Sequence, residues 1–106
     1  MKTALIRGAG DLASGVAAQL ARNGWRILMT ELPQPLSVRC QVSFSRAVYE
    51  GSCRVEELEA CRVDGLPAWE GLPQGLIGVT VAPYREVLAA IRPSLVVDGI
   101  MAKHNL

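Results

Sequence analysis

The first thirty residues contain an apolar run, a glycine-rich turn and a helical segment, and this unit constrains the fold more than any other feature. Residues 8–13 read Gly-Ala-Gly-Asp-Leu-Ala, a G-x-G-x-x-A pattern that follows the strand-like run 3–6. In such a turn the first glycine reverses the chain, the second lets backbone approach a pyrophosphate, and the small last residue lets the helix pack close to the strand. The pattern therefore predicts a strand followed by a helix whose N-terminus holds an anion.

The residues that follow support this interpretation. Leu12, Val16 and Leu20 recur every four positions and predict a buried stripe, with small alanines beside it. Asn23-Gly24 is typical of a helix end, and residues 25–30 predict a second strand that ends at Glu31. Glu31 lies 21 positions after Gly10, about where an acid that binds a ribose is expected. The alternative is a plain turn with a solvated acid.

Two charged residues leave the ligand open. Asp11 lies at the helix start, where its carboxylate would cap the N–H groups that a phosphate would otherwise bind and would repel that phosphate. The alternative is that Asp11 has only a structural role. Arg7 would compensate for its charge. Arg39 could reach back to bind a phosphate of the ligand or the 2′-phosphate of NADP, which would blur the preference for NAD that Glu31 suggests. The alternative is that Arg39 is a solvated surface residue.

Composition excludes several classes of protein. The chain has 106 residues, a formal net charge of +1 and 50% hydrophobic residues, which suits one small globular domain and no nucleic-acid surface. We find no signal peptide and no apolar run of membrane-spanning length, so we expect a cytoplasmic protein. The three cysteines lack a C-x-x-C spacing and predict no metal site, and Cys61 is expected to be buried.

The rest of the chain predicts alternating strands and helices. A short helix is expected over 43–49 with Gly51 as its stop, then either a hairpin turning near Glu56-Glu57, which we favour, or a frayed helix. Residues 65–78 read as a loop, 76–81 as a strand, and Pro83 as the first residue of a helix that Pro93 ends. An apolar strand over 94–101, covered on both faces, completes a right-handed, doubly wound α/β sheet of about four strands with a small hairpin insertion, in the order 3-2-1-4.

The last predicted strand has no following helix to cover it. Residues 1–106 are therefore expected to form a single Rossmann-like nucleotide-binding domain, the N-terminal fragment of a longer protein, or a homo-oligomer that pairs through the exposed sheet edge. Asp98 lies near the carboxyl end of this strand, with Lys103 and Asn105 in the loop after it. The candidate cofactor-binding residues are Gly8, Ala9, Gly10, Asp11, Leu12, Ala13, Glu31, Arg39, Asp98, Lys103 and Asn105.

A family resemblance rests on several of these segments together, which are Gly-Ala-Gly-Asp-Leu-Ala at 8–13, Met-Thr-Glu at 29–31, residues 44–51 and Ala-Lys-His-Asn at 102–105. In this combination the chain resembles the N-terminal part of the selenium-dependent molybdenum hydroxylase accessory family, the YqeB-type proteins. The resemblance implies a Rossmann-like domain in a protein that helps mature or operate a molybdenum hydroxylase related to xanthine dehydrogenase.

The resemblance leaves the ligand and the reaction open. A nucleotide and a molybdopterin-type cofactor both present phosphate oxygens to backbone N–H groups, so the turn does not choose between them. The competing interpretation is an NAD(P)-dependent oxidoreductase whose substrate domain lies beyond Leu106. No catalytic residue is assigned, and Lys103 is more readily explained as a solvated lysine than as a proton donor.

Overall fold

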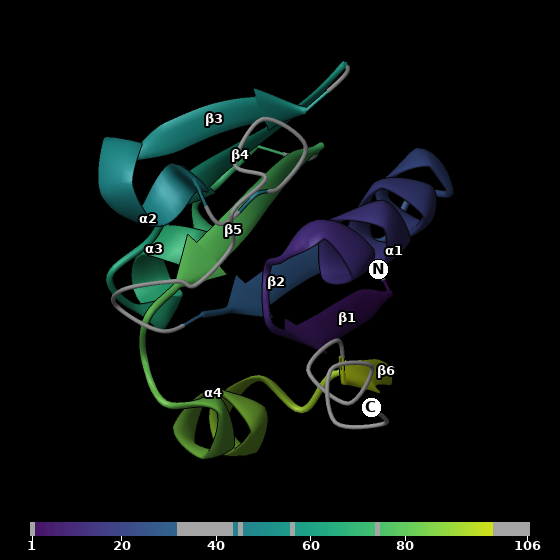
Figure 1. Cartoon of the computed structure of the whole chain (residues 1–106). Coiled ribbons are helices and arrows are strands. Elements are labelled where there is room, and N and C mark those ends of the chain that lie inside the picture. Colours follow the sequence, from purple (N-terminus) through teal and green to yellow (C-terminus); the bar gives the residue numbers. More distant parts are fainter. Residues whose placement is uncertain (1, 32–43, 45, 56, 74, 99–106) are drawn as a thin grey trace, which may run out of the picture.

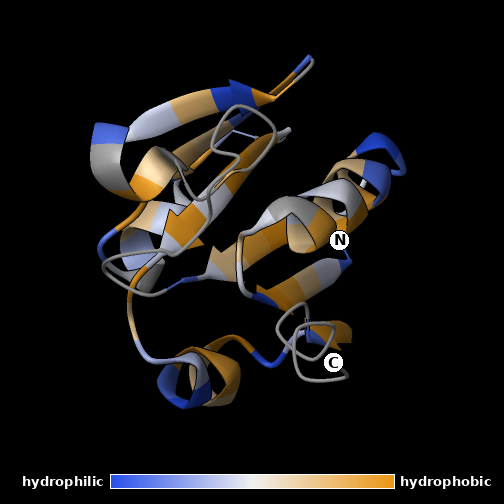
Figure 2. Cartoon of the chain, in the orientation of Figure 1, coloured by the Kyte–Doolittle hydropathy of each residue, from blue (hydrophilic) through white to orange (hydrophobic). Residues whose placement is uncertain are grey.

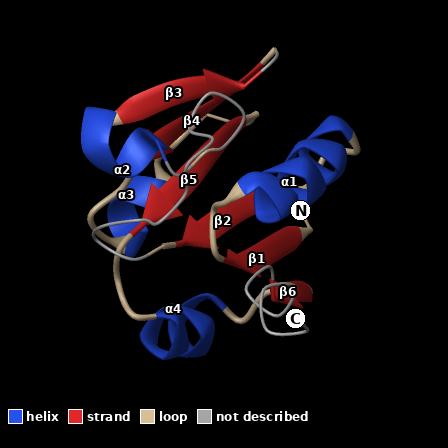
Figure 3. Cartoon of the chain, in the orientation of Figure 1, coloured by secondary structure: helices blue, strands red, loops and turns tan. Residues whose placement is uncertain are grey.

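The structure is a computed structural model that describes residues 2–31, 44, 46–55, 57–73 and 75–98. Strands and helices alternate along the described chain except for two consecutive strands in its middle, and the strands form one sheet (Figures 1 and 3). The elements are β1 (Thr3–Arg7), α1 (Asp11–Arg22), β2 (Arg26–Thr30), α2 (Arg46–Glu50), β3 (Ser52–Val55), β4 (Leu58–Arg62), α3 (Leu66–Glu70), β5 (Leu76–Thr80), α4 (Tyr84–Ile91) and β6 (Leu95–Asp98).

Within the described residues the sheet has six strands, in the order β3-β4-β5-β2-β1-β6. All neighbouring strands are parallel except β3 and β4, which form an antiparallel hairpin at one edge. The strands β5-β2-β1-β6 have the predicted 3-2-1-4 order. The predicted count of about four strands is wrong, because β4 pairs in parallel with β5 and so adds the hairpin to the sheet itself.

Helices pack on both faces of the sheet. On one face α1 and α2 cover a core that includes Ile6, Met29 and Phe44. On the other face Trp69 of α3 and Val87 of α4 contact a second core with Leu5 and Leu28. The central strands are thus buried on both sides, and Figure 2 shows the hydrophobic residues concentrated along them.

The buried face predicted for α1 is wrong, because the helix is rotated about its axis relative to the prediction. Leu12 is 57% exposed, whereas the residues of α1 that are buried are the small ones, Ala13, Ser14, Ala17 and Ala18. Small side chains at this contact let the helix backbone lie close to the strands, as the last residue of the turn pattern requires. Val16 and Leu20 pack at the margin of the core.

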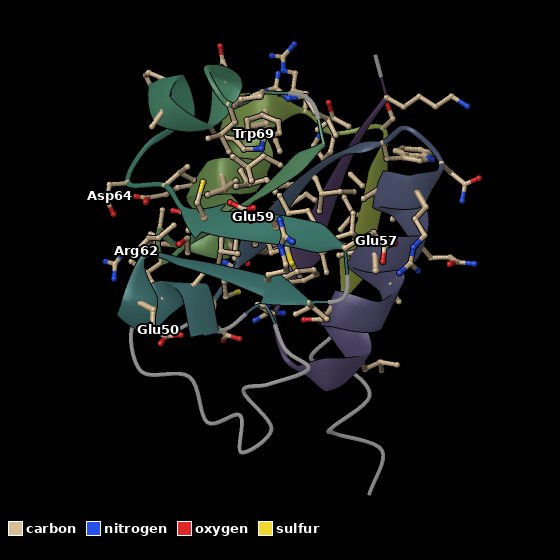
Figure 4. All side chains as sticks on the ribbon, turned by 90° about the horizontal axis from the view of Figure 1, so that it is seen from above. Glu50, Glu57, Glu59, Arg62, Asp64 and Trp69 are labelled. Atoms are coloured by element: carbon tan, nitrogen blue, oxygen red, sulfur yellow. The ribbon has the colours of Figure 1, made fainter. Side chains whose placement is uncertain are left out.

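The middle of the chain agrees in part with the prediction. The hairpin turning near residues 56–57 is confirmed. Gly51 ends α2, with a φ of +84° and an N–H that bonds the Ala47 carbonyl at 2.9 Å. The predicted cap of α2 at Ser43 lies outside the described residues. Several exposed charged side chains of this region, Glu57, Glu59, Arg62 and Asp64 among them, are labelled in Figure 4.

The prediction of an uninterrupted loop over 65–78 is wrong, because α3 forms within it. Arg26 on β2 explains how so short a helix is held in place. Its Nη2 donates to the carbonyl oxygens of Trp69 at 2.7 Å and Glu70 at 2.9 Å, and its guanidinium lies 4.8 Å from the Trp69 ring centroid. A distant arginine thus satisfies carbonyls at the C-terminal end of α3.

The last elements differ slightly from their predicted bounds. Pro83 is the N-cap of α4 rather than its first residue, and Arg92 ends the helix in the left-handed conformation with a φ of +46°. Within the described residues β6 pairs with β1 alone, and Val96 is 43% exposed, so β6 is an edge strand and not a strand covered on both faces. The predicted continuation to Met101 lies outside the described residues.

None of the helices in the described part of the chain is both long and apolar enough to cross a membrane.

Candidate functional site

The glycine-rich turn starts where β1 ends at the carboxyl edge of the sheet. Gly8 has a φ of +97°, a conformation that costs a residue with a Cβ roughly 1–2 kcal/mol. Its N–H donates to the Thr30 carbonyl at 2.7 Å and extends the pairing of β1 with β2 by one residue. The prediction that Gly8 permits the tight reversal is confirmed.

Gly10 is the N-cap of α1. Its φ of −74° and ψ of −168° are extended values that any residue adopts, so backbone geometry does not require glycine there. Its carbonyl accepts the Ser14 N–H at 2.8 Å and starts the helix. Asp11 is therefore the first helical residue and not the N-cap. Because Gly10 has no side chain, the first-turn amides receive no hydrogen bond from an N-cap side chain.

Glu31 contacts the turn directly. Its Oε2 accepts the Ala9 N–H at 2.9 Å, and its own N–H donates to the Thr80 carbonyl at 2.9 Å. The first of these bonds ties the end of β2 to the turn after β1, and the second ties it to the end of β5. The sequence spacing that singled out Glu31 therefore does place its carboxylate beside the glycine-rich turn.

Ser14 is a site residue that the sequence analysis missed. Its buried hydroxyl donates to the Ala9 carbonyl at 3.0 Å and accepts the Phe44 N–H at 2.8 Å. Both backbone polar groups of Ala9 are thus hydrogen-bonded to side chains, the N–H to Glu31 and the carbonyl to Ser14. A serine among alanines on the inner face of a helix was the available signal, since a buried hydroxyl needs a hydrogen-bond partner.

We expect Ser14→Ala to lower the free energy of unfolding by about 1–3 kcal/mol, because it leaves the buried Phe44 N–H and the Ala9 carbonyl without this partner. Urea denaturation measures the change. The matched control is Ser52→Ala on the exposed start of β3, which should change stability by less than about 0.5 kcal/mol. Equal effects of the two substitutions would contradict the bridging role of Ser14.

Asp98 lies at the end of β6, opposite Arg7 at the end of β1. Arg7 Nη1 is 3.5 Å from Asp98 Oδ2, and the Arg7 guanidinium lies 5.3 Å from the centroid of the Tyr84 ring at the start of α4. Arg7 and Asp98 are paired across the parallel strands in register. This group occupies the same carboxyl edge of the sheet as the glycine-rich turn.

Of the remaining candidate cofactor-binding residues, some lie among the described residues and others do not. Leu12 is exposed on the first turn of α1 and Ala13 is buried against the sheet. Arg39, Lys103 and Asn105 lie outside the described residues.

Cys61 is partly exposed, so the prediction that it is buried is wrong in degree. Desolvation raises the pKa of its thiol, and the nearby Glu59 carboxylate adds a smaller effect in the same direction. Within the described residues no cluster of His, Cys, Asp and Glu could hold a metal ion.

In the part of the chain that the structure describes, these features define an α/β protein with a mostly parallel six-stranded sheet and a glycine-rich strand-to-helix turn at its carboxyl edge. The chain is similar to uncharacterized protein YqeB of Escherichia coli (strain K12), with 41% identity over 103 residues that cover 96% of this chain. The chain spans only 19% of the length of that relative. No family model and no solved structure matches the chain.

Proposed function

We propose that the chain is a Rossmann-like, doubly wound nucleotide-binding domain of a YqeB-type protein, and that residues 8–13 bind a phosphate group. The main support is the hydrogen bond between the Ala9 N–H and Glu31 Oε2. It places the turn that would hold the phosphates beside the acid at the end of the second strand that would hold the ribose.

The residues present fit a phosphate ester. Gly8 and Gly10 leave the turn without side chains, and the first turn of α1 offers backbone N–H groups that have no partner within the helix. Glu31 would accept hydrogen bonds from ribose hydroxyls. A molybdopterin-type cofactor would use the same amides through its phosphate, but it offers no ribose to Glu31 unless it carries a nucleotide.

We propose, from the family resemblance, that this binding serves the maturation or operation of a molybdenum hydroxylase of the xanthine dehydrogenase type. The similarity to YqeB supports the family part of this proposal. In this role the domain would hold a nucleotide or the cofactor while the partner enzyme is assembled, and the chain itself need not catalyse a reaction.

The alternative is an NAD(P)-dependent oxidoreductase, which the position of Glu31 favours. The bound dinucleotide would supply hydride transfer, and this chain would supply the phosphate turn and the ribose acid. Asp98 would lie at the crevice between β1 and β6, with Lys103 and Asn105 proposed nearby on sequence grounds. An NAD preference is expected, because a carboxylate disfavours the 2′-phosphate of NADP.

Calorimetry with ADP, NAD and NADP tests the binding proposal. We expect heat of binding with ADP and NAD and weaker binding of NADP; absence of heat with all three would contradict nucleotide binding. For the accessory role, the tagged protein should co-purify with a molybdenum hydroxylase recognised by its molybdenum content, and failure of purified partner and chain to associate would contradict that role.

A further inference from the structure

The sheet order places three chemical groups in a row along one edge. Glu31 follows β2, the glycine-rich turn follows β1, and Asp98 ends β6, and these strands are neighbours in the order β2-β1-β6. A ligand whose ribose lies at Glu31 and whose first phosphate lies on the turn therefore extends toward the β1–β6 end. What it meets there is Arg7.

Arg7 is held in position without being buried. The Tyr84 ring supports one side of its guanidinium at 5.3 Å, and Asp98 Oδ2 lies 3.5 Å from Nη1. The Arg7 side chain is nevertheless 46% exposed. A guanidinium has five N–H donors, and within the described residues only one hydrogen bond to Asp98 and the contact with Tyr84 engage it.

The contact with Asp98 is weak enough to be exchanged. A separation of 3.5 Å is long for a charge-assisted hydrogen bond, and both side chains are in contact with solvent. A phosphate presents up to three oxygens to the planar guanidinium and binds it through two N–H groups at once. An anionic group of a ligand thus competes well with Asp98 for Arg7.

We propose that Arg7 binds a second anionic group of the ligand, the phosphate farther from the ribose, with Tyr84 and Asp98 as its positioning residues. This inference rests on the proposed nucleotide binding and adds the ligand class, a nucleoside diphosphate or its ester rather than a monophosphate. The glycine pattern alone does not assign this role, because it is silent on the residue before the first glycine.

Calorimetric titration of the chain with AMP and with ADP tests the inference. The wild-type protein should bind ADP more tightly than AMP. Arg7→Gln should weaken ADP binding about tenfold while AMP binding changes less than about twofold, since only ADP has the second phosphate. Arg7→Lys should recover part of the loss, because it retains the charge but not the planar pair of donors.

The matched control is Arg85→Gln, which removes the same charge from the exposed surface of α4 next to Tyr84. It should leave the ratio of the two dissociation constants unchanged. An equal loss for AMP and ADP in Arg7→Gln, or no loss for either, would overturn the role of Arg7 and leave nucleotide binding standing. Failure of the wild-type protein to bind either nucleotide would overturn the proposed function and this inference with it.

Discussion

Gly10→Ala is expected to weaken nucleotide binding about 30-fold or more, a loss of about 2 kcal/mol, and to lower the free energy of unfolding by no more than about 1 kcal/mol, because alanine is a poorer N-cap than glycine. Gly10 has a φ of −74° and a ψ of −168°, so an alanine fits the backbone without strain. Its Cβ, however, would occupy the space through which a pyrophosphate approaches the turn. Calorimetry with ADP and urea denaturation measure the two quantities on the same protein.

Two other glycines provide controls for this substitution. Gly15 lies on the exposed side of α1, where an added Cβ meets no atom within 4 Å, so Gly15→Ala should leave binding unchanged and stabilise the helix by about 0.5–1 kcal/mol. Gly8→Ala should instead destabilise the fold, because its φ is +97°. Unaltered ADP affinity in Gly10→Ala would contradict phosphate binding at the turn.

Trp69→Ala is expected to lower the free energy of unfolding by about 3–5 kcal/mol. Trp69, which is labelled in Figure 4, is 5% exposed, and its Nε1 donates to the Ile27 carbonyl at 3.0 Å. Its ring also lies against the Arg26 guanidinium. The substitution therefore removes core volume, a hydrogen bond to β2 and the contact that holds α3, and urea denaturation measures the total. A loss below about 1 kcal/mol would contradict this role of Trp69.

Gly78→Ala provides a test of the same packing from the opposite side. An added Cβ would lie 2.5 Å from Trp69 Cδ1 and 3.2 Å from Leu28 Cδ1, so we expect a cost of about 1–3 kcal/mol. In a Trp69→Ala background the closest contact is gone, and the cost should fall below about 1 kcal/mol. The same cost in both backgrounds would show that Trp69 does not pack on Gly78.

The parts of the fold predicted correctly are those that local chemistry determines. Gly8 takes a conformation that favours glycine, Gly51 ends α2 in the left-handed region, and the turn near 56–57 joins two strands. The order of the parallel strands follows from the right-handed connection rule and not from any single residue. At the site, the spacing of Glu31 from the turn placed its carboxylate at the Ala9 N–H.

The parts that were missed depend on contacts between distant segments. The C-terminal end of α3 is bonded by Arg26, more than forty positions away, whose guanidinium donates to the Trp69 and Glu70 carbonyls. Leu12 is apolar and in phase with a helical stripe, yet it is exposed, because the need for close helix–strand approach places small residues inward. Periodicity ranks residues by hydrophobicity and does not detect that requirement. Pairing of Arg7 with Asp98 likewise depends on the register of β1 and β6.

Amide NMR during a titration with ADP tests most directly whether the backbone of the first turn binds phosphate. The largest chemical-shift changes are predicted at the amides of residues 10–13, with a smaller change at Ala9 because its N–H is bonded to Glu31. Saturation of these changes with a single dissociation constant would support the site. Saturable changes centred on the β3–β4 hairpin, with residues 10–13 unaffected, would contradict it.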